Sequence, residues 1–191
     1  QVTILAALLD RVPRAPHERW RLYKLYFNTI YDRELGRRSD AADILRAQRP
    51  HIEAIHTRAA LHLQVACEAE GSTSALLSHD ALLAIVDARL AEQHSDAERR
   101  DKLAREILEV AANRLVFLVS PREGFYGFEL RSLQEFMAAE AIMNGREQTV
   151  DGCIRRIART TLWRNVLLFA ISRCFADSHP LTEAFTVDLC E

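Results

Sequence analysis

Apolar residues recur at spacings of three and four along most of the chain, a pattern typical of amphipathic helices. The clearest case is the segment from His17 to Gly36, where the apolar stripe is made of large side chains: Trp20, Tyr23, Phe27, Ile30 and Tyr31. Weaker stripes with the same spacing predict three more helices, over residues 50–70, 79–93 and 95–114. We therefore expect four helices in the first 114 residues.

Residues that start or stop helices flank these segments. Pro50 stands where the second helix is expected to begin, and Gly71 follows its expected end. Ser78 is a candidate N-cap for the third helix. Ser95, with Glu98 three residues later, has the pattern of a capping box and predicts the start of the fourth helix.

The period of the pattern changes after residue 114. The short apolar run Leu115–Ser120 is followed by the turn-forming residues 121–124 and by a second, aromatic run over 125–129. Two such runs around a turn predict a β-hairpin. Gly127 between aromatic residues indicates a bulge or a close backbone approach.

Helical spacing resumes at Leu133, where Ser132 and Glu135 have the pattern of a second capping box. Shorter helices are expected over 149–160, 162–174 and 181–190. The predicted fold is mainly α: a helical bundle with a winged-helix-like unit of three helices and a hairpin, followed by further helices. We expect a helical segment over 1–48, a winged-helix-like domain over 49–145 and the start of a helical, α-solenoid-like region over 146–191.

Composition is that of an ordinary soluble protein, with a net charge of -2 over 191 residues. No apolar run approaches the roughly 18 residues that cross a membrane, and no secretory signal is present. The four cysteines form no CxxC pair and are expected to be reduced thiols: Cys67, Cys153, Cys174 and Cys190. We therefore expect a cytoplasmic protein without membrane contact, and the apolar start, Val2 to Leu9, suggests a piece of a larger chain.

The winged-helix order raises the question of DNA binding, which the charge on residues 95–114 argues against. DNA-reading helices normally present a basic face, whereas five basic residues here are offset by five acidic ones. The basic residues are Arg99, Arg100, Lys102, Arg105 and Arg114. The acidic residues are Asp96, Glu98, Asp101, Glu106 and Glu109. Nucleic acid is thus an unlikely partner.

No set of residues predicts catalysis or metal binding. His56 and His62 are six positions apart on one predicted helix and face different directions. Asp32 and Glu34 also do not converge, and the capping role accounts for Ser132 without a nucleophilic one. Neither GxxxxGK[ST] nor GxGxxG occurs. We expect no enzymatic activity, metal or nucleotide cofactor in this piece itself.

Residues 125–139, FYGFELRSLQEFMAA, resemble the winged-helix signature of NACHT-type signalling ATPases of the STAND class, which includes NOD-like receptors. The matching positions are Ser132, Gln134, Glu135, Phe136, Ala138 and Ala139. Residues 2–5, Pro13 and 19–23 resemble the family's exit from its nucleotide-binding domain. Residues 162–169 resemble the first helices of its sensor region.

The resemblance implies a regulatory switch in a parent ATPase that binds ATP or ADP with Mg²⁺ through motifs outside this sequence. Its partners would be the upstream nucleotide-binding domain, the downstream sensor, other copies on activation and a protein ligand, and its role would be in bacterial antiviral defence. Leu130 occupies a position where the family often has a phosphate-contacting histidine, so the neighbouring Arg131 is the candidate contact to the nucleotide domain. A winged-helix DNA-binding regulator and a helical interaction scaffold remain alternatives.

The residues expected to matter for the switch are structural. Ser132 and Glu135 would cap the helix after the hairpin, beside Gln134. Four aromatic residues would pack the hairpin on the three helices: Phe125, Tyr126, Phe128 and Phe136.

Overall fold

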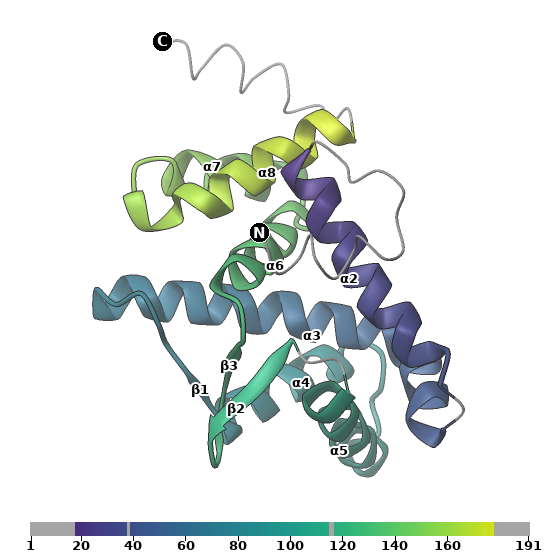
Figure 1. The fold of residues 1–191 in the computed structure, drawn as a ribbon. Coiled ribbons are helices and arrows are strands. Elements are labelled where there is room, and N and C mark those ends of the chain that lie inside the picture. Colours follow the sequence, from purple (N-terminus) through teal and green to yellow (C-terminus); the bar gives the residue numbers. More distant parts are fainter. Residues whose placement is uncertain (1–17, 38, 115–116, 178–191) are drawn as a thin grey trace.

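The computed structural model describes residues 18–37, 39–114 and 117–177. Within these ranges the chain forms seven α-helices and a small three-stranded antiparallel sheet (Figure 1). This confirms the predicted fold class, a mainly α bundle that carries a β-hairpin. Residues 2–9 and the predicted helix over 181–190 lie outside the described ranges.

Helix α2 spans Arg19–Leu35 and ends at Gly36, as its aromatic stripe predicts. The stripe is the buried side of the helix: Tyr23, Phe27, Ile30 and Tyr31 are all at most 8% exposed. Tyr31 also donates its hydroxyl proton to the carbonyl of Leu45, 3.0 Å away, which ties α2 to the next helix.

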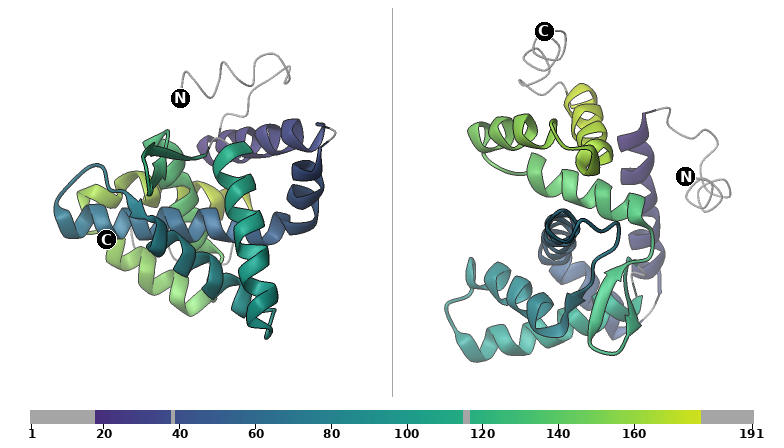
Figure 2. Two further views of the ribbon diagram at one scale, coloured as in Figure 1. Left: turned by 90° about the horizontal axis from the view of Figure 1, so that it is seen from below. Right: turned by 90° about the vertical axis from the view of Figure 1, so that its left-hand side faces the viewer.

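Helix α3 spans Asp40–Glu70, so the predicted start at Pro50 is wrong by ten residues. Ser39 is the N-cap, and its hydroxyl accepts from the Ala42 amide at 3.4 Å. Pro50 lies inside the helix, where it removes one backbone hydrogen bond and favours a kink. Figure 2 shows the first turns of α3 running in a different direction from the rest. The predicted end holds, because Gly71 closes the helix with φ of +60°.

Helices α4 and α5 span His79–Ala91 and Ala97–Arg114, close to prediction. Ser78 caps α4, accepting from the Ala81 amide at 3.2 Å. The predicted Ser95 cap of α5 is wrong by one residue. The carboxylate of Asp96 accepts from the amides of residues 98 and 99 at 2.9 and 3.2 Å, while Ser95 offers its carbonyl to Arg100.

The sheet has the order β1-β3-β2, with β1 at Leu77–Ser78, β2 at Leu118–Arg122 and β3 at Phe125–Phe128. The predicted hairpin is therefore present, with a turn at residues 123–124 where Gly124 adopts a φ of +74°. Pairing is irregular between residues 119 and 122, which gives β2 one extra residue there. The irregularity, on an edge strand, accommodates Pro121.

Strand β1 was not predicted, because two residues are too short to show an alternating pattern. It places Leu76 and Leu77 beside β3, and a Cβ added to Gly127 would lie 2.8 Å from Leu76 Cδ2. The glycine thus allows the close approach that the sequence indicated. The resulting order, α3-β1-α4-α5-β2-β3, is that of a winged-helix unit.

Helix α6 spans Arg131–Met143, and its N-cap is Leu130, which has extended backbone dihedrals and no capping side chain. The predicted capping box of Ser132 and Glu135 is therefore wrong, because Ser132 is already the second helical residue. The carboxylate of Glu135 instead accepts from Arg131 Nε at 3.1 Å and from Asn165 Nδ2 at 3.2 Å.

The remaining described chain forms α7 at Glu147–Ile157, a 3₁₀ turn at Thr161–Trp163 and α8 at Arg164–Ala176. Both predicted helices are confirmed, with ends shifted by two or three residues. Helix α6 packs against α3 on one side and against α8 on the other, as Figure 1 shows. It is the middle layer of the molecule.

One apolar cluster runs from α2 to α8, and Phe136 lies inside it. Its ring, 1% exposed, is 5.7 Å from the ring of Tyr23 and 5.6 Å from that of Phe169. These three rings join α2, α6 and α8 through tilted and edge contacts, which aromatic pairs prefer.

Two of the hairpin aromatic residues, Tyr126 and Phe128, lie against the core, and the Phe128 ring is 6.5 Å from that of His56 on α3. Phe125, Tyr126 and Phe128 are only half-buried, and Phe125 stacks under the guanidinium of Arg122 at 3.6 Å. The fully buried aromatic residue is Phe117, just before β2, whose ring stacks on Phe27 with centroids 5.0 Å apart.

We predict that Phe136→Ala lowers the free energy of unfolding by about 3–5 kcal/mol, because it empties a fully enclosed ring site. Phe125→Ala is the matched control and should lower it by only about 1–2 kcal/mol, since that ring is only partly buried. Denaturant melts of both variants measure this difference. Equal losses in the two variants would contradict the assigned packing.

His56 links α3 to the residues around the hairpin and is fully buried. Its Nδ1 donates to the Ile52 carbonyl at 2.8 Å, and its ring contacts Phe117 edge-on at a centroid distance of 5.7 Å. Nε2 has no hydrogen-bond partner among the described residues. Burial lowers the pKa of His56 from 6.5 to about 4, because the apolar surroundings disfavour the charged ring.

This lowered pKa makes stability depend on pH. Between pH 6.5 and about 4 the unfolded chain binds the proton more readily than the folded one, so stability falls with falling pH. The loss attributable to His56 approaches about 3 kcal/mol. Urea melts between pH 7 and 4 should show a smaller loss for His56→Leu than for the wild type. His62→Gln, at an exposed position on the same helix, should keep the wild-type slope; an unchanged slope in His56→Leu would refute the assignment.

Candidate functional site

Helix α6 carries two carboxylates into the interior of the protein. Glu135 is 3% exposed and Glu140 is 5% exposed. A buried carboxylate is stable only if charged or hydrogen-bonding partners replace the lost water. The partners of these two residues come from helices far away in the sequence.

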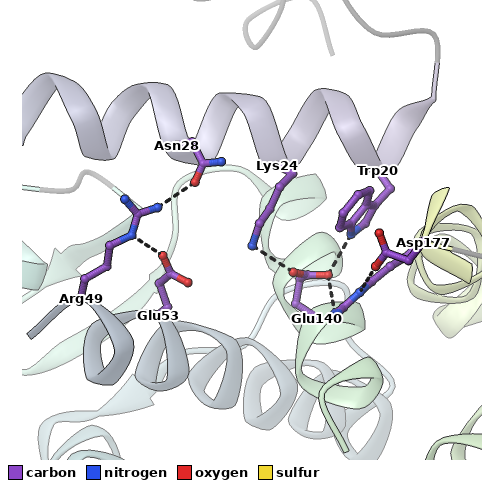
Figure 3. A network of polar contacts seen from close by, with 8 residues as sticks. Trp20, Lys24, Asn28, Arg49, Glu53, Glu140 and Asp177 are labelled. Atoms are coloured by element: carbon purple, nitrogen blue, oxygen red, sulfur yellow. Dashed lines mark hydrogen bonds and ion pairs between the residues drawn. The ribbon is translucent and has the colours of Figure 1, made fainter. Parts of the chain in front are cut away.

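Glu140 is the centre of the larger network, which Figure 3 shows in close-up. Its Oε1 accepts from Trp20 Nε1 at 2.8 Å and from an Arg173 guanidinium nitrogen at 2.9 Å. Its Oε2 pairs with Lys24 Nζ at 3.3 Å. Trp20 and Lys24 lie one turn apart on α2, while Arg173 lies on α8. One carboxylate therefore joins three helices, and we call this set of four residues the Glu140 hub.

The hub is extended on the α8 side by Asp177, which accepts from Arg173 Nε at 3.3 Å. Arg173 and Lys24 keep part of their side chains in solvent, with exposures of 20% and 36%. The two cations can therefore be hydrated if the helices separate, whereas the carboxylate is held deep between them.

Glu135 forms a second link between the same helices. Asn165, which donates to Glu135, accepts in turn from an Arg19 nitrogen at 3.3 Å. The Arg19 guanidinium also lies 4.4 Å from the centre of the Phe169 ring. The link thus runs from α6 through α8 to the first turn of α2.

Gln134 forms a third link, through a buried amide pair. Its Nε2 donates to Gln64 Oε1 at 3.1 Å, and Gln64 donates to the Leu162 carbonyl at 3.0 Å. This chain connects α6 and α3 to the turn before α8. Of the predicted residues, Gln134, Glu135 and Phe136 therefore come together on α6 facing α2, α3 and α8.

The other predicted residues lie apart from this site. Arg131 donates to the Thr73 carbonyl and to Glu135, so its guanidinium already has partners within the chain. Ser132 is half-buried without a capping bond. Tyr126 belongs to the hairpin, where its hydroxyl lies 3.5 Å from His79 Nδ1.

A pocket of about 630 Å³ borders the hub, between α2, α3 and α6. Lys24 and Glu140 form one side of it, and Pro50, Phe27 and Phe136 contribute apolar surface. Its volume is in the range of small-molecule sites. The helices around the hub are thus not closely packed on every side.

The described residues contain no group of three His, Cys, Asp or Glu side chains placed to hold a metal ion. His56 is buried, whereas His62 on the same helix is exposed. Glu34 is also a buried carboxylate. It is 2% exposed and paired with Arg33 and Arg37.

Across the described ranges, no helix has the length and apolar character needed to cross a bilayer.

Comparisons of the chain with protein-family models, with curated proteins and with solved structures found no match. The functional reading therefore depends on the contacts themselves. Of the hub residues, only Trp20 was named from the sequence, as part of the aromatic stripe of α2. The available signal was Glu140 itself, a single charge inside the otherwise apolar run 136–143.

We predict that Glu140→Ala lowers the free energy of unfolding by about 3 kcal/mol, because Lys24, Arg173 and Trp20 lose a shared buried acceptor. Glu140→Gln should lose less, since the amide oxygen can still accept from Trp20. Glu53→Ala, which breaks the half-exposed pair with Arg49, serves as control and should cost at most about 1 kcal/mol. Chemical denaturation measures all three, and a Glu140→Ala loss no larger than that of Glu53→Ala would contradict the hub.

Proposed function

We propose that this chain is the regulatory junction of a NACHT-like signalling ATPase of the STAND class. In this proposal α2 leads from the nucleotide-binding domain, α3 to α6 form the winged-helix domain, and α7 and α8 begin the sensor. The observation that carries the proposal is the Glu140 hub, because it binds side chains from all three parts to one buried carboxylate.

The hub could work as a two-state contact. In the closed state Glu140 holds Lys24 and Trp20 of α2 together with Arg173 of α8. A ligand that pulls α8 away removes one cation from a buried carboxylate, which weakens the closed arrangement of α2 as well. Such a contact couples a sensor to a nucleotide domain without a catalytic residue in between.

The resemblance supplies the rest of the proposal. The parent protein would bind ADP with Mg²⁺ at rest and exchange it for ATP on activation, then oligomerise in the cytoplasm as part of antiviral defence. Leu130 cannot donate a hydrogen bond to a phosphate. Arg131 would have to give up its bond to Thr73 or Glu135 to contact the nucleotide domain. We therefore assign the coupling to the hub rather than to a nucleotide contact by Arg131.

The DNA-binding alternative gains no support from α5. Two of its arginines are engaged with acidic neighbours, Arg105 with Asp101 and Arg100 with Asp87 of α4. Ion-paired arginines contribute little to a positive field for phosphates.

The first test is the coding sequence upstream of Gln1. The proposal expects a phosphate-binding loop and a Walker B strand within about three hundred codons, a span of two ordinary domains. Full-length protein carrying Arg173→Ala should then lose bound ADP and oligomerise without ligand. Arg105→Ala, at an exposed position on α5, should behave as wild type. An upstream region without these motifs, or an Arg173→Ala protein that retains ADP and stays monomeric, would overturn the proposal.

A further inference from the structure

A small polar pocket of about 370 Å³ lies between α3, the turn after α4 and the first half of α5. His51 of α3 lines it on one side, His94 lines it from the turn after α4, and α5 contributes Arg99 and Lys102. Helix α5 packs against α3, and α4 packs against both, so the fold itself holds these walls together. The volume is at the lower end of the range of small-molecule sites.

His51 has a buried ring nitrogen without a partner. The side chain is 6% exposed, and its Nδ1 makes no hydrogen bond to any described residue. An unsatisfied buried polar atom is costly, and in native proteins it commonly marks the position of a water molecule or an ion. His56 also has an unpartnered nitrogen, but its ring lies against the rings of Phe117 and Phe128, whereas His51 borders a polar pocket.

Basic side chains gather around the same pocket. The rings of His51 and His94 have centroids 5.8 Å apart. Arg99 and Lys102 are exposed, and neither side chain has an ion-pair partner among the described residues. Arg105, further along the same helix, is by contrast paired with a neighbouring aspartate. The two cations of the pocket are thus available to a ligand.

The charge balance of the pocket favours an anion. Among the residues that line it, Glu106 is the one carboxylate, so the net charge is one positive with neutral histidines and three positive when both are protonated. The described residues hold no group of three side chains that could bind a metal ion. Guanidinium, ammonium and protonated imidazole groups are strong donors to phosphate oxygens. The chemistry of the pocket therefore fits a compact anion with several oxygens.

We propose that this pocket binds the phosphate group of a small molecule, with donors to its oxygens from His51, His94, Arg99 and Lys102. A nucleic acid is a poorer fit, because it requires an extended basic face, and α5 is balanced by its acidic residues outside the pocket. The pocket shares no residue with the Glu140 hub, so the inference does not depend on the proposed ATPase switch.

The pocket also predicts how binding depends on pH. Burial lowers the pKa of His51, and so do the charges of Arg89 and His94. The charge of Glu92 and a hydrogen bond to Gln93 raise it. The charged and titratable groups that face the ring come from α4, the turn after it and α5: Arg89, Glu92, His94, Arg99, Lys102 and Glu106.

The free His51 ring is therefore mostly neutral at pH 7, and a bound dianion raises its pKa again. A protonated ring can donate at both nitrogens, whereas a neutral ring donates at one. Proton uptake thus accompanies binding, and the affinity for an anion of constant charge should rise as the pH falls from 8 to 6.

The test is an NMR titration of the histidine ring protons with sodium sulfate, an anion whose charge is constant over this pH range. Sodium chloride of equal ionic strength is the reference. The signals of His51 and His94, assigned with His51→Gln and His94→Gln, should shift saturably with sulfate, and more tightly at pH 6 than at pH 8. The signal of the buried His56 should stay in place. Shifts no larger than those in chloride, or an affinity that does not change with pH, would overturn the proposal.

Charge variants separate the site from general attraction to a basic surface. Arg99→Ala and Lys102→Ala should each weaken sulfate binding about tenfold, the effect of losing one charge-assisted hydrogen bond. Both side chains are exposed, so these variants keep the fold. Arg105→Ala removes the same charge from the same helix outside the pocket and should leave the affinity within about twofold. Equal losses in all three variants would contradict a built site.

Competition against sulfate identifies the source of the phosphate. Glycerol 3-phosphate or phenyl phosphate should displace sulfate at a lower concentration than inorganic phosphate does, because the rest of the molecule adds contacts in the pocket. Inorganic phosphate that competes better than both esters would reduce the site to an ion site and overturn the proposal. A short DNA duplex that competes better than the esters would overturn it in favour of a nucleic acid.

Discussion

The burial of the Glu140 carboxylate is the constraint on which the arrangement of the helices depends. A charge that is only 5% exposed needs partners, and here they are Trp20, Lys24 and Arg173. Each partner reaches it only if α2 and α8 lie at their observed positions beside α6. Replacing a whole buried ion-pair set by apolar side chains of similar volume is often energetically neutral, so the value of the hub lies in fixing which helices meet.

Apolar packing and the polar links specify the same arrangement. The rings of Tyr23, Phe136 and Phe169 join α2, α6 and α8 at the centre. The amides of Gln64 and Gln134 connect α3 to the turn before α8. Helix α6 takes part in both sets of contacts, through Phe136 and Gln134. A displacement of α8 would therefore disturb the ring cluster and the hub together, as the proposed switch requires.

The sequence predicted the elements well where their signals are local and repeated. The aromatic stripe of α2, the glycine after α3 and the hairpin runs all have a period or a special backbone requirement that a single segment displays. Prediction failed where one residue competed with another for a role. Pro50 is a strong signal for the start of a helix. Helix α3 nevertheless begins before it, because Ser39 caps the helix and the buried Ala42 and Leu45 anchor its first turns. Asp96 rather than Ser95 accepts the hydrogen bonds at the start of α5. Leu130 is the N-cap residue of α6, so Ser132 already lies inside the helix and cannot cap it.

The candidate site was largely invisible in the sequence for a different reason. Trp20 and Glu140 are 120 residues apart, and neither lies in a motif that indicates its partner. Glu140 could be recognised as unusual inside an apolar helix, but only the packing of three helices reveals which cations neutralise it. Phe117 was likewise missed, because the aromatic residues after the turn gave the more conspicuous pattern.

The central claim is that the hub couples α8 to α2 through α6, and native-state hydrogen exchange of Arg173→Ala tests it most directly. The account predicts faster amide exchange in α8, in α6 around residue 140 and in α2 around residues 20–24, because all three share the weakened carboxylate site. Faster exchange confined to α8, with α2 as protected as in the wild type, would contradict the coupling.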